Sequence, residues 1–194
     1  MPCRRAFGDR KFMNVIGLDP GNEQSAIVIW NGSEIQLTRL LPNNAILSYL
    51  ADWGRQGGLC GADFASDVKR GSIEIAPLVI EKIASFGMPV GAEVFETVYW
   101  SGRFAEAYGA DHVHRITRGE VKMHLCHSMR AKDGNVRQAL IDRLGAPGTR
   151  KAPGVTHGVS KDLWSALAVA VTFWDQHNAP AVLSEARQET GKVG

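Results

Sequence analysis

Three acidic residues stand at positions where the neighbouring residues predict burial. Asp19 ends an apolar strand pattern, Glu81 lies inside a nearly continuous apolar run, and Asp162 opens an otherwise apolar helical pattern. An ionised carboxylate is costly to bury alone, and several together repel one another unless a cation lies between them. Their hard oxygen atoms suit Mg²⁺ or Mn²⁺, ions that commonly act on phosphate esters. The three residues are therefore candidate metal ligands.

Each acid also has a purely structural interpretation. Asp19 precedes Pro20 and Gly21 and could form an Asx turn. Glu81 could face solvent from one side of a sheet, and Asp162 could lie in the first turn of a helix, where the helix dipole favours a negative charge. Their joint placement indicates a shared site, because they lie at the end of the first predicted strand, within the fourth and at the start of the last helix.

Hydrophobic periodicity and turn residues predict the elements that position these acids. The chain begins with three strands, at 14–19, 26–30 and 34–40, joined by turns at 20–22 and 31–32, so they form an antiparallel meander. The elements predicted after them are a helix at 43–54, a strand at 77–83, a helix at 90–108, a strand at 111–116 and helices at 118–125, 135–144 and 161–174. This order predicts an α/β fold in which helices flank a five-stranded mixed sheet.

Composition excludes several classes of protein. The 194 residues are 44% hydrophobic and carry a net charge of +2, which fits one folded domain rather than a disordered chain. No apolar run approaches the roughly 20 residues of a membrane span. The three cysteines form no C-x-x-C pair, which indicates a reducing cytoplasm and no structural zinc. We expect a basic extension at 1–12, a folded domain at 13–176 and a polar tail at 177–194.

Positively charged residues are concentrated in the second half of the chain. Residues 115–151 contain nine basic and three acidic side chains, whereas residues 41–112 contain five basic and nine acidic ones. Such a basic block within one domain predicts a surface for a polyanion such as DNA. An ordinary solvated helix face is the alternative.

Four segments, in this order along the chain, resemble the RuvC-type Holliday junction resolvases of the RNase H-like superfamily. IGLDPG at 16–21 is similar to the first-strand motif of the family, and LVIE at 78–81 to its fourth-strand acid. RAKDGNV at 130–136 is similar to G-R-A-x-K-x-x-V with the lysine one place earlier, and DLWSALAVA at 162–170 to D-x-x-D-A-L-A-x-A. The similarity is greatest to the phage and prophage branch, and it implies an RNase H-like nuclease domain at 13–176.

The resemblance implies roles for individual residues. Asp19, Glu81 and Asp162 would bind two divalent ions, Mg²⁺ or Mn²⁺, that bracket the scissile phosphate. Lys122 matches a family lysine near that phosphate and would be catalytic, and Lys132 matches a second one. The DNA contacts would come from Gly21, which lacks a side chain, and from the basic residues Arg118, Lys122, Arg130, Lys132, Arg137, Arg150 and Lys151.

One position departs from the family pattern. Ser165 stands where the family usually has a fourth acid, and a hydroxyl is a poor substitute for a carboxylate on Mg²⁺. Because it lies one turn after Asp162, both side chains are expected on one helix face, so Ser165 or another group must complete the metal shell. His157, in the loop before Asp162, is the nearest other candidate. An imidazole suits Mn²⁺ better than Mg²⁺ and could instead orient the attacking water, although a surface-loop histidine is the alternative.

The implied activity is that of a divalent-metal-dependent, structure-selective endonuclease that nicks four-way or other branched DNA junctions in the cytoplasm. Two symmetric nicks suit a homodimer, with the helix around Val94, Val98, Tyr99 and Trp100 as the candidate interface. One alternative is a junction-binding protein without cleavage activity, which Ser165 favours. The other is an actin-like sugar or acetate kinase, which begins with a similar strand, acid and glycine turn but needs two such domains.

Overall fold

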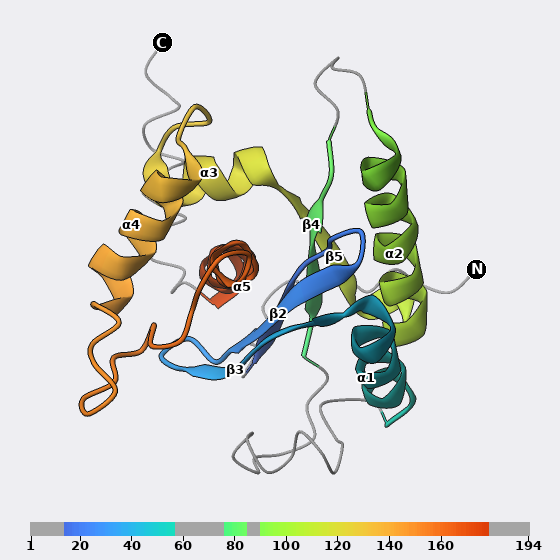
Figure 1. Ribbon diagram of the computed structural model, residues 1–194, viewed down its shortest axis with the longest axis horizontal. Helices are drawn as coiled ribbons and strands as arrows, with labels where there is room; N and C mark the ends of the chain where they lie inside the picture. The colour runs from blue at the N-terminus through green and yellow to red at the C-terminus, as the bar shows by residue number, and fades with distance from the viewer. Residues whose placement is uncertain (1–13, 57–75, 85–89, 179–194) are drawn as a thin grey trace, which may run out of the picture.

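A computed structural model of the chain describes residues 14–56, 76–84 and 90–178 (Figure 1). The predicted extension at 1–12 and the predicted tail beyond Asn178 lie outside these residues. The elements are β1 (Val15–Asp19), β2 (Gln24–Trp30), β3 (Ile35–Pro42), α1 (Asn43–Gln56), β4 (Leu78–Lys82), α2 (Ala92–Tyr108), a short 3-10 helix η1 (Ala110–His112), β5 (Val113–Thr117), α3 (Arg118–Cys126), α4 (Asp133–Leu144) and α5 (Leu163–Asn178).

The described strands form one mixed sheet in the order β3-β2-β1-β4-β5. β1, β2 and β3 are antiparallel neighbours, whereas β4 runs parallel to β1, and β5 runs parallel to β4. Asn31 closes the turn between β2 and β3, because its side-chain oxygen accepts hydrogen bonds from the backbone N–H groups of Ser33 and Glu34. The predicted α/β fold, with an antiparallel meander followed by parallel strands, is therefore confirmed.

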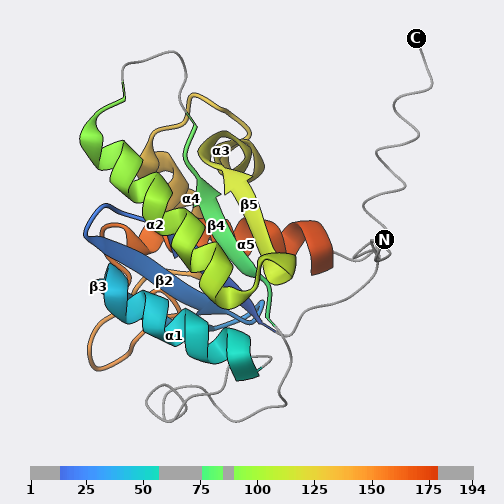
Figure 2. The same cartoon turned by 90° about the vertical axis from the view of Figure 1, so that its right-hand side faces the viewer.

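Helices cover both faces of this sheet (Figures 1 and 2). Side chains alternate between the faces along each strand, so one strand contributes to two cores. Ile16 and Leu18 of β1 pack in the core formed with α1 and α2, whereas Val15 and the neighbouring Val79 pack against α5 on the other face. Asp19 continues the alternation of Val15, so it belongs to the α5 face.

Helix α5 lies directly against β1. A Cβ atom added to Gly17 would be 2.2 Å from the carbonyl oxygen of Ala166 and 2.8 Å from the Cβ of Ala170. Such a close approach requires glycine on the strand and small residues on the helix. It places the first turn of α5 next to the end of β1, where Asp19 lies.

Asp175 joins the three helices on this face. Its Oδ1 accepts a hydrogen bond of 2.6 Å from Nη2 of Arg143 in α4, and its Oδ2 lies 2.7 Å from Nε2 of His124 in α3. Asp175 itself lies in the last part of α5, which continues to Asn178, two residues beyond the domain boundary predicted at 176. These contacts fix α3 and α4, which carry much of the basic block, relative to α5.

The packing at Gly17 predicts opposite effects for two glycine substitutions. Gly17→Ala should lower the free energy of unfolding by about 3 kcal/mol, because the new methyl group overlaps the backbone of α5. Gly102→Ala, in α2 and with no atom within 4 Å of the added Cβ, should raise it by about 0.5–1 kcal/mol. Urea unfolding of the two variants checks this, and equal effects of the two changes would contradict the packing argument.

Candidate active site

Asp19 and Glu81 emerge side by side from the sheet. β1 and β4 are parallel, and Leu18 pairs with Ile80, so the next residues on the two strands are Asp19 and Glu81. Residues in register on neighbouring strands face the same side, which is the side that α5 covers. Glu81 is buried, with 8% of its surface exposed. The fold therefore brings together two of the three acids predicted as metal ligands.

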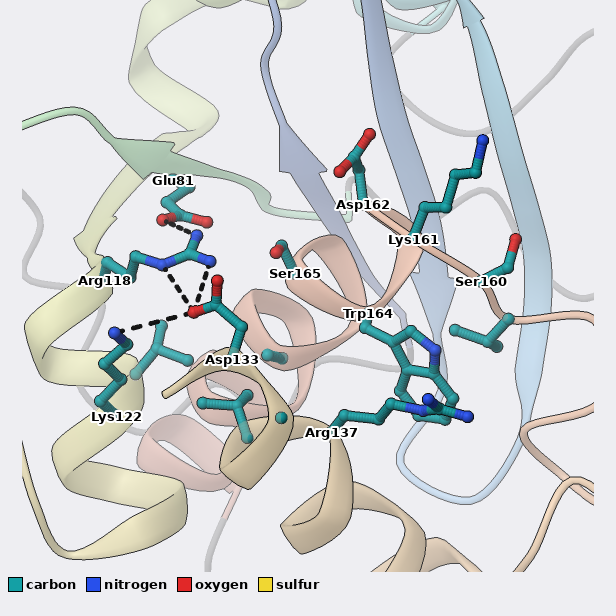
Figure 3. Close-up of a pocket in the computed structure, with 15 residues that line it drawn as sticks. Glu81, Arg118, Lys122, Asp133, Arg137, Ser160, Lys161, Asp162, Trp164 and Ser165 are labelled. Carbon is teal, nitrogen blue, oxygen red and sulfur yellow. Dashed lines mark hydrogen bonds and ion pairs between the residues drawn. The ribbon is translucent and has the colours of Figure 1, made fainter. Parts of the chain in front are cut away.

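Arg118 forms an ion pair with Glu81, one of these two acids. Its Nη1 donates a hydrogen bond of 2.9 Å to Oε1 of Glu81 (Figure 3). Arg118 opens α3 directly after β5, and a capping box fixes this start: the N–H of Glu120 donates to Oγ1 of Thr117, and the N–H of Thr117 donates to the Glu120 carboxylate. Thr117 pairs with Lys82 of β4, the residue after Glu81. The capped start of α3 therefore places the Arg118 guanidinium next to the Glu81 carboxylate.

Asp133 binds the same guanidinium and was not singled out in the sequence. Its Oδ1 lies 2.8 Å from Nη2 of Arg118 and 3.7 Å from Nζ of Lys122. The hydrogen bond from Arg118 is the main reason why the pKa of Asp133 is lowered. Burial acts to lower the pKa of Arg118, but Glu81 and Asp133 outweigh burial and raise it. The sequence contained one sign of this role: in the RAKDGNV segment, Asp133 stands where the family motif has a lysine.

Asp162 lies just before α5 rather than inside it, and both Asp162 and Ser165 act on the pKa of Asp19. α5 begins at Leu163, and the carbonyl of Asp162 accepts hydrogen bonds from the N–H groups of Ser165 and Ala166, as the residue before a helix does. Asp162 is exposed, and its carboxylate points away from Ser165 (Figure 3). Through hydrogen bonding, the Ser165 hydroxyl acts to lower the pKa of Asp19.

The three predicted acids interact electrostatically. Burial raises the pKa of Asp19 to about 7, and the charges of Glu81 and Asp162 contribute to the rise. Arg118 and the hydrogen bond from Ser165 act in the opposite direction but do not cancel it. Burial is therefore the main reason why Asp19 favours its protonated form, and the neighbouring acids add to this preference.

A cavity of about 510 Å³ opens beside the ion pair of Glu81 and Arg118 (Figure 3). Two more basic residues of the predicted DNA-binding set, Lys122 and Arg137, also line it. The Arg137 guanidinium lies 5.4 Å from the centre of the Trp164 ring, which forms part of the apolar wall. The cavity thus combines a cationic rim with the buried carboxylate of β4.

A second hollow, of about 360 Å³, adjoins the first, because Asp162 lines both. Asp19 and Gly21 also line it. A Cβ on Gly21 would lie 2.2 Å from the carbonyl oxygen of Gln24, and the Gly21 N–H donates to Oγ of Ser25. The turn itself therefore requires glycine here, whereas contact between Gly21 and DNA stays a prediction.

The remaining predicted residues line neither hollow. They are exposed and comprise Arg130, Lys132, Arg150, Lys151 and His157. Nδ1 of His157 lies 3.2 Å from the carbonyl oxygen of Pro147, to which it donates within its own loop. The structure therefore does not bring His157 to the acids. The basic block divides into residues on the cavity wall and residues on the surface around it.

These features define an α/β protein of the RNase H-like fold, with carboxylates at the ends of neighbouring parallel strands. Two solved structures with this fold are similar to the chain at 16% sequence identity. Thermus thermophilus RuvC in complex with Holliday junction substrate has a TM-score of 0.57, covering 87% of this chain and 95% of that chain. A second Thermus thermophilus RuvC structure has a TM-score of 0.56, covering 84% and 95%. The resemblance to RuvC-type resolvases is therefore confirmed at the level of the fold.

No protein-family model matches the chain, and no curated protein matches it. Within the residues that the structure describes, no three histidine, cysteine or acidic side chains lie close enough together to hold a metal ion. None of the described helices has the length and apolar character that crossing a membrane requires.

The raised pKa of Asp19 predicts a pH-dependent stability in the absence of divalent ions. Between the ordinary value near 3.8 and about 7, folded Asp19 keeps a proton that the unfolded chain has lost. The free energy of unfolding should therefore fall as the pH rises from about 4 to 7. Asp19→Asn should abolish this decline and raise the stability at pH 8 by about 2–4 kcal/mol. Urea unfolding in EDTA at pH 5 and 8 measures it, with Asp111→Asn, outside both hollows, as the control. A decline that persists in Asp19→Asn would assign it to other groups.

Proposed function

We propose that this chain is a divalent-metal-dependent, structure-selective endonuclease that nicks four-way or other branched DNA junctions in the cytoplasm. The observation that carries the proposal is the pair of strand-end carboxylates, Asp19 and Glu81, beside the start of α5 in a fold similar to that of RuvC. The similar Thermus thermophilus protein was solved in complex with Holliday junction substrate. A cationic cavity next to the two acids supports the same class of substrate here.

The donor atoms fit a divalent ion. Asp19 and Asp162 supply hard oxygen ligands, and a cation would relieve the repulsion between acids that contributes to the raised pKa of Asp19. Asp19 and Asp162 line one hollow, and Mg²⁺ commonly uses one or two carboxylates together with several waters. A bound ion would polarise the scissile phosphate and lower the pKa of the attacking water.

Basic residues would position the DNA. Lys122, on the cavity wall near Asp133, is the proposed catalytic lysine, because an ammonium group beside the reacting phosphate stabilises its developing negative charge. Arg137 would contact a neighbouring phosphate from the same wall. Weaker contacts would come from the surrounding surface, namely from Arg130, Lys132, Arg150 and Lys151. Phosphate contacts fix the position of the substrate without reading its sequence.

Two observations favour a second candidate function, junction binding without cleavage. Ser165 replaces an acid of the family motif, and the Glu81 carboxylate is already paired with Arg118. A protein with these features could retain the DNA surface after losing metal-dependent chemistry. The described residues form a single sheet, whereas an actin-like kinase needs two such domains.

Cleavage of a synthetic four-way junction in Mg²⁺ separates the two functions. The wild-type protein should nick the junction, and Asp19→Asn, Glu81→Gln and Asp162→Asn should each lower the rate roughly a hundredfold or more. Binding should persist or become tighter, because each change removes a negative charge that faces DNA phosphates. Gel electrophoresis of end-labelled junctions measures both quantities.

Asp142→Asn, an exposed change on α4 that touches neither hollow, serves as the matched control and should cleave at the wild-type rate. A shifted junction without products, in Mg²⁺ and in Mn²⁺, would favour the non-cleaving binder. Normal cleavage by Glu81→Gln would contradict the assignment of the acids.

We also propose that the chain forms a homodimer through α2. Phe95, Val98 and Tyr99 are 65%, 52% and 58% exposed and follow the spacing of one helix face. Trp100, by contrast, is partly buried and stacks on Phe104 of its own chain. An apolar stripe on one face of a helix suits contact with a second copy, and two-fold symmetry would supply two active sites for two nicks.

Introducing charge on this stripe should dissociate the dimer. Phe95→Glu combined with Val98→Glu should raise the dissociation constant about a hundredfold, because each change buries an unpaired carboxylate in the interface. Sedimentation velocity at micromolar concentration measures it. Val155→Glu, at a residue 37% exposed outside α2, is the control. A wild-type protein that sediments as a monomer, with and without a junction, would contradict the dimer.

A further inference from the structure

Arg118 places a positive charge next to the Glu81 carboxylate, where a metal-binding site would place a metal ion. Its guanidinium contacts the buried Glu81 carboxylate at 2.9 Å and is held by two contacts with Asp133, of 2.8 Å from Nη2 and 3.3 Å from Nε. Side chains fixed from two sides keep their position without reorganisation. The cation is therefore a built part of the site rather than a chance surface pair.

Charge balance limits what else the site can hold. Asp19, Glu81 and Asp162 carry three negative charges when ionised, and Arg118 leaves two of them uncompensated, which one divalent ion neutralises. Asp133, which contacts both Arg118 and Lys122, adds one negative charge, and Lys122 adds one positive charge, so they leave this balance unchanged. Two divalent ions together with the guanidinium would leave two positive charges in excess. Such an excess is costly in a partly buried site, where charges interact strongly.

The neutral side chain of Ser165 agrees with this balance between acids and cations. A fourth carboxylate would add the negative charge that a second ion needs, but the side chain at this position on the cavity wall is a neutral hydroxyl. The missing acid and the added guanidinium change the site in the same direction, towards fewer metal ions. Asp162 lines both hollows, so an ion that it shares with Asp19 would lie next to the cavity that Glu81 and Arg118 line.

We propose that the guanidinium of Arg118 takes the place of one of two divalent ions, so that this site binds a single ion, held by Asp19 and Asp162. This inference rests on the metal-dependent nuclease proposed above and replaces its expected pair of ions by one ion and one arginine. Arg118 thereby supplies the fixed positive charge on the Glu81 side of the site.

The number of bound ions tests the proposal without any cleavage assay. Mn²⁺ titration followed by electron paramagnetic resonance counts the ions in four proteins: wild type, Arg118→Gln, Ser165→Asp and the double variant. Wild type and both single variants should bind one ion per chain, and the double variant two. Arg118→Gln should bind its ion roughly tenfold more tightly, because a repelling charge is gone.

Two controls separate charge from structure. Arg118→Lys should retain one ion at nearly wild-type affinity, because it keeps the charge. Arg55→Gln removes an arginine from an exposed ion pair with Asp52 and should change neither number nor affinity.

Two ions in the wild type would overturn the proposal. So would two ions in Ser165→Asp alone, because the missing acid would then suffice to explain the count, and so would one ion in a folded double variant. If the double variant does not fold, the wild-type and Ser165→Asp counts decide the question. No ion in any protein would contradict the metal-dependent nuclease as well. One ion in a wild type that does not cleave junctions would contradict only the nuclease.

Discussion

At Gly17 the backbone of β1 lies against Ala166 and Ala170 of α5 with no room for a side chain. This contact fixes the depth and the register of the helix on the sheet. That register determines where the first turn of α5 lies, and so brings Ser165 close to Asp19. It also brings Asp162 to the hollow that Asp19 lines. The candidate site thus depends on a contact between small residues that carry no chemistry themselves.

The sheet contributes the second constraint. Parallel pairing of β1 with β4 brings Asp19 next to Glu81, and parallel pairing of β4 with β5 brings Arg118 to Glu81 through the capped start of α3. Two carboxylates so close together repel each other, and burial strengthens the repulsion. Arg118 forms its ion pair with Glu81, and the hollow that Asp19 and Asp162 line is the proposed cation site.

Ion pairs determine how the basic block is divided. Arg118 and Lys122 contact Asp133 on the cavity wall. Arg143 donates a hydrogen bond to Asp175 and thereby links α4 to α5. Arg150 and Lys151, which are close in sequence to this group, lie outside both hollows. The basic residues of 115–151 therefore have three different places: some join helices, some line the cavity and some are exposed outside both hollows.

The sequence by itself determined the order of strands and helices, because alternating and helical hydrophobic patterns, together with turns such as that at Asn31, are local properties. It also singled out Asp19, Glu81 and Asp162 through their conflict with apolar surroundings. Only the tertiary structure decided that Asp162 lines both hollows, that His157 bonds within its own loop and that Asp133 and Arg118 occupy the site. The reason is physical: a side chain's direction at a helix start and its ionic partners depend on residues distant in sequence, which meet only when α3, α4 and α5 pack on the sheet.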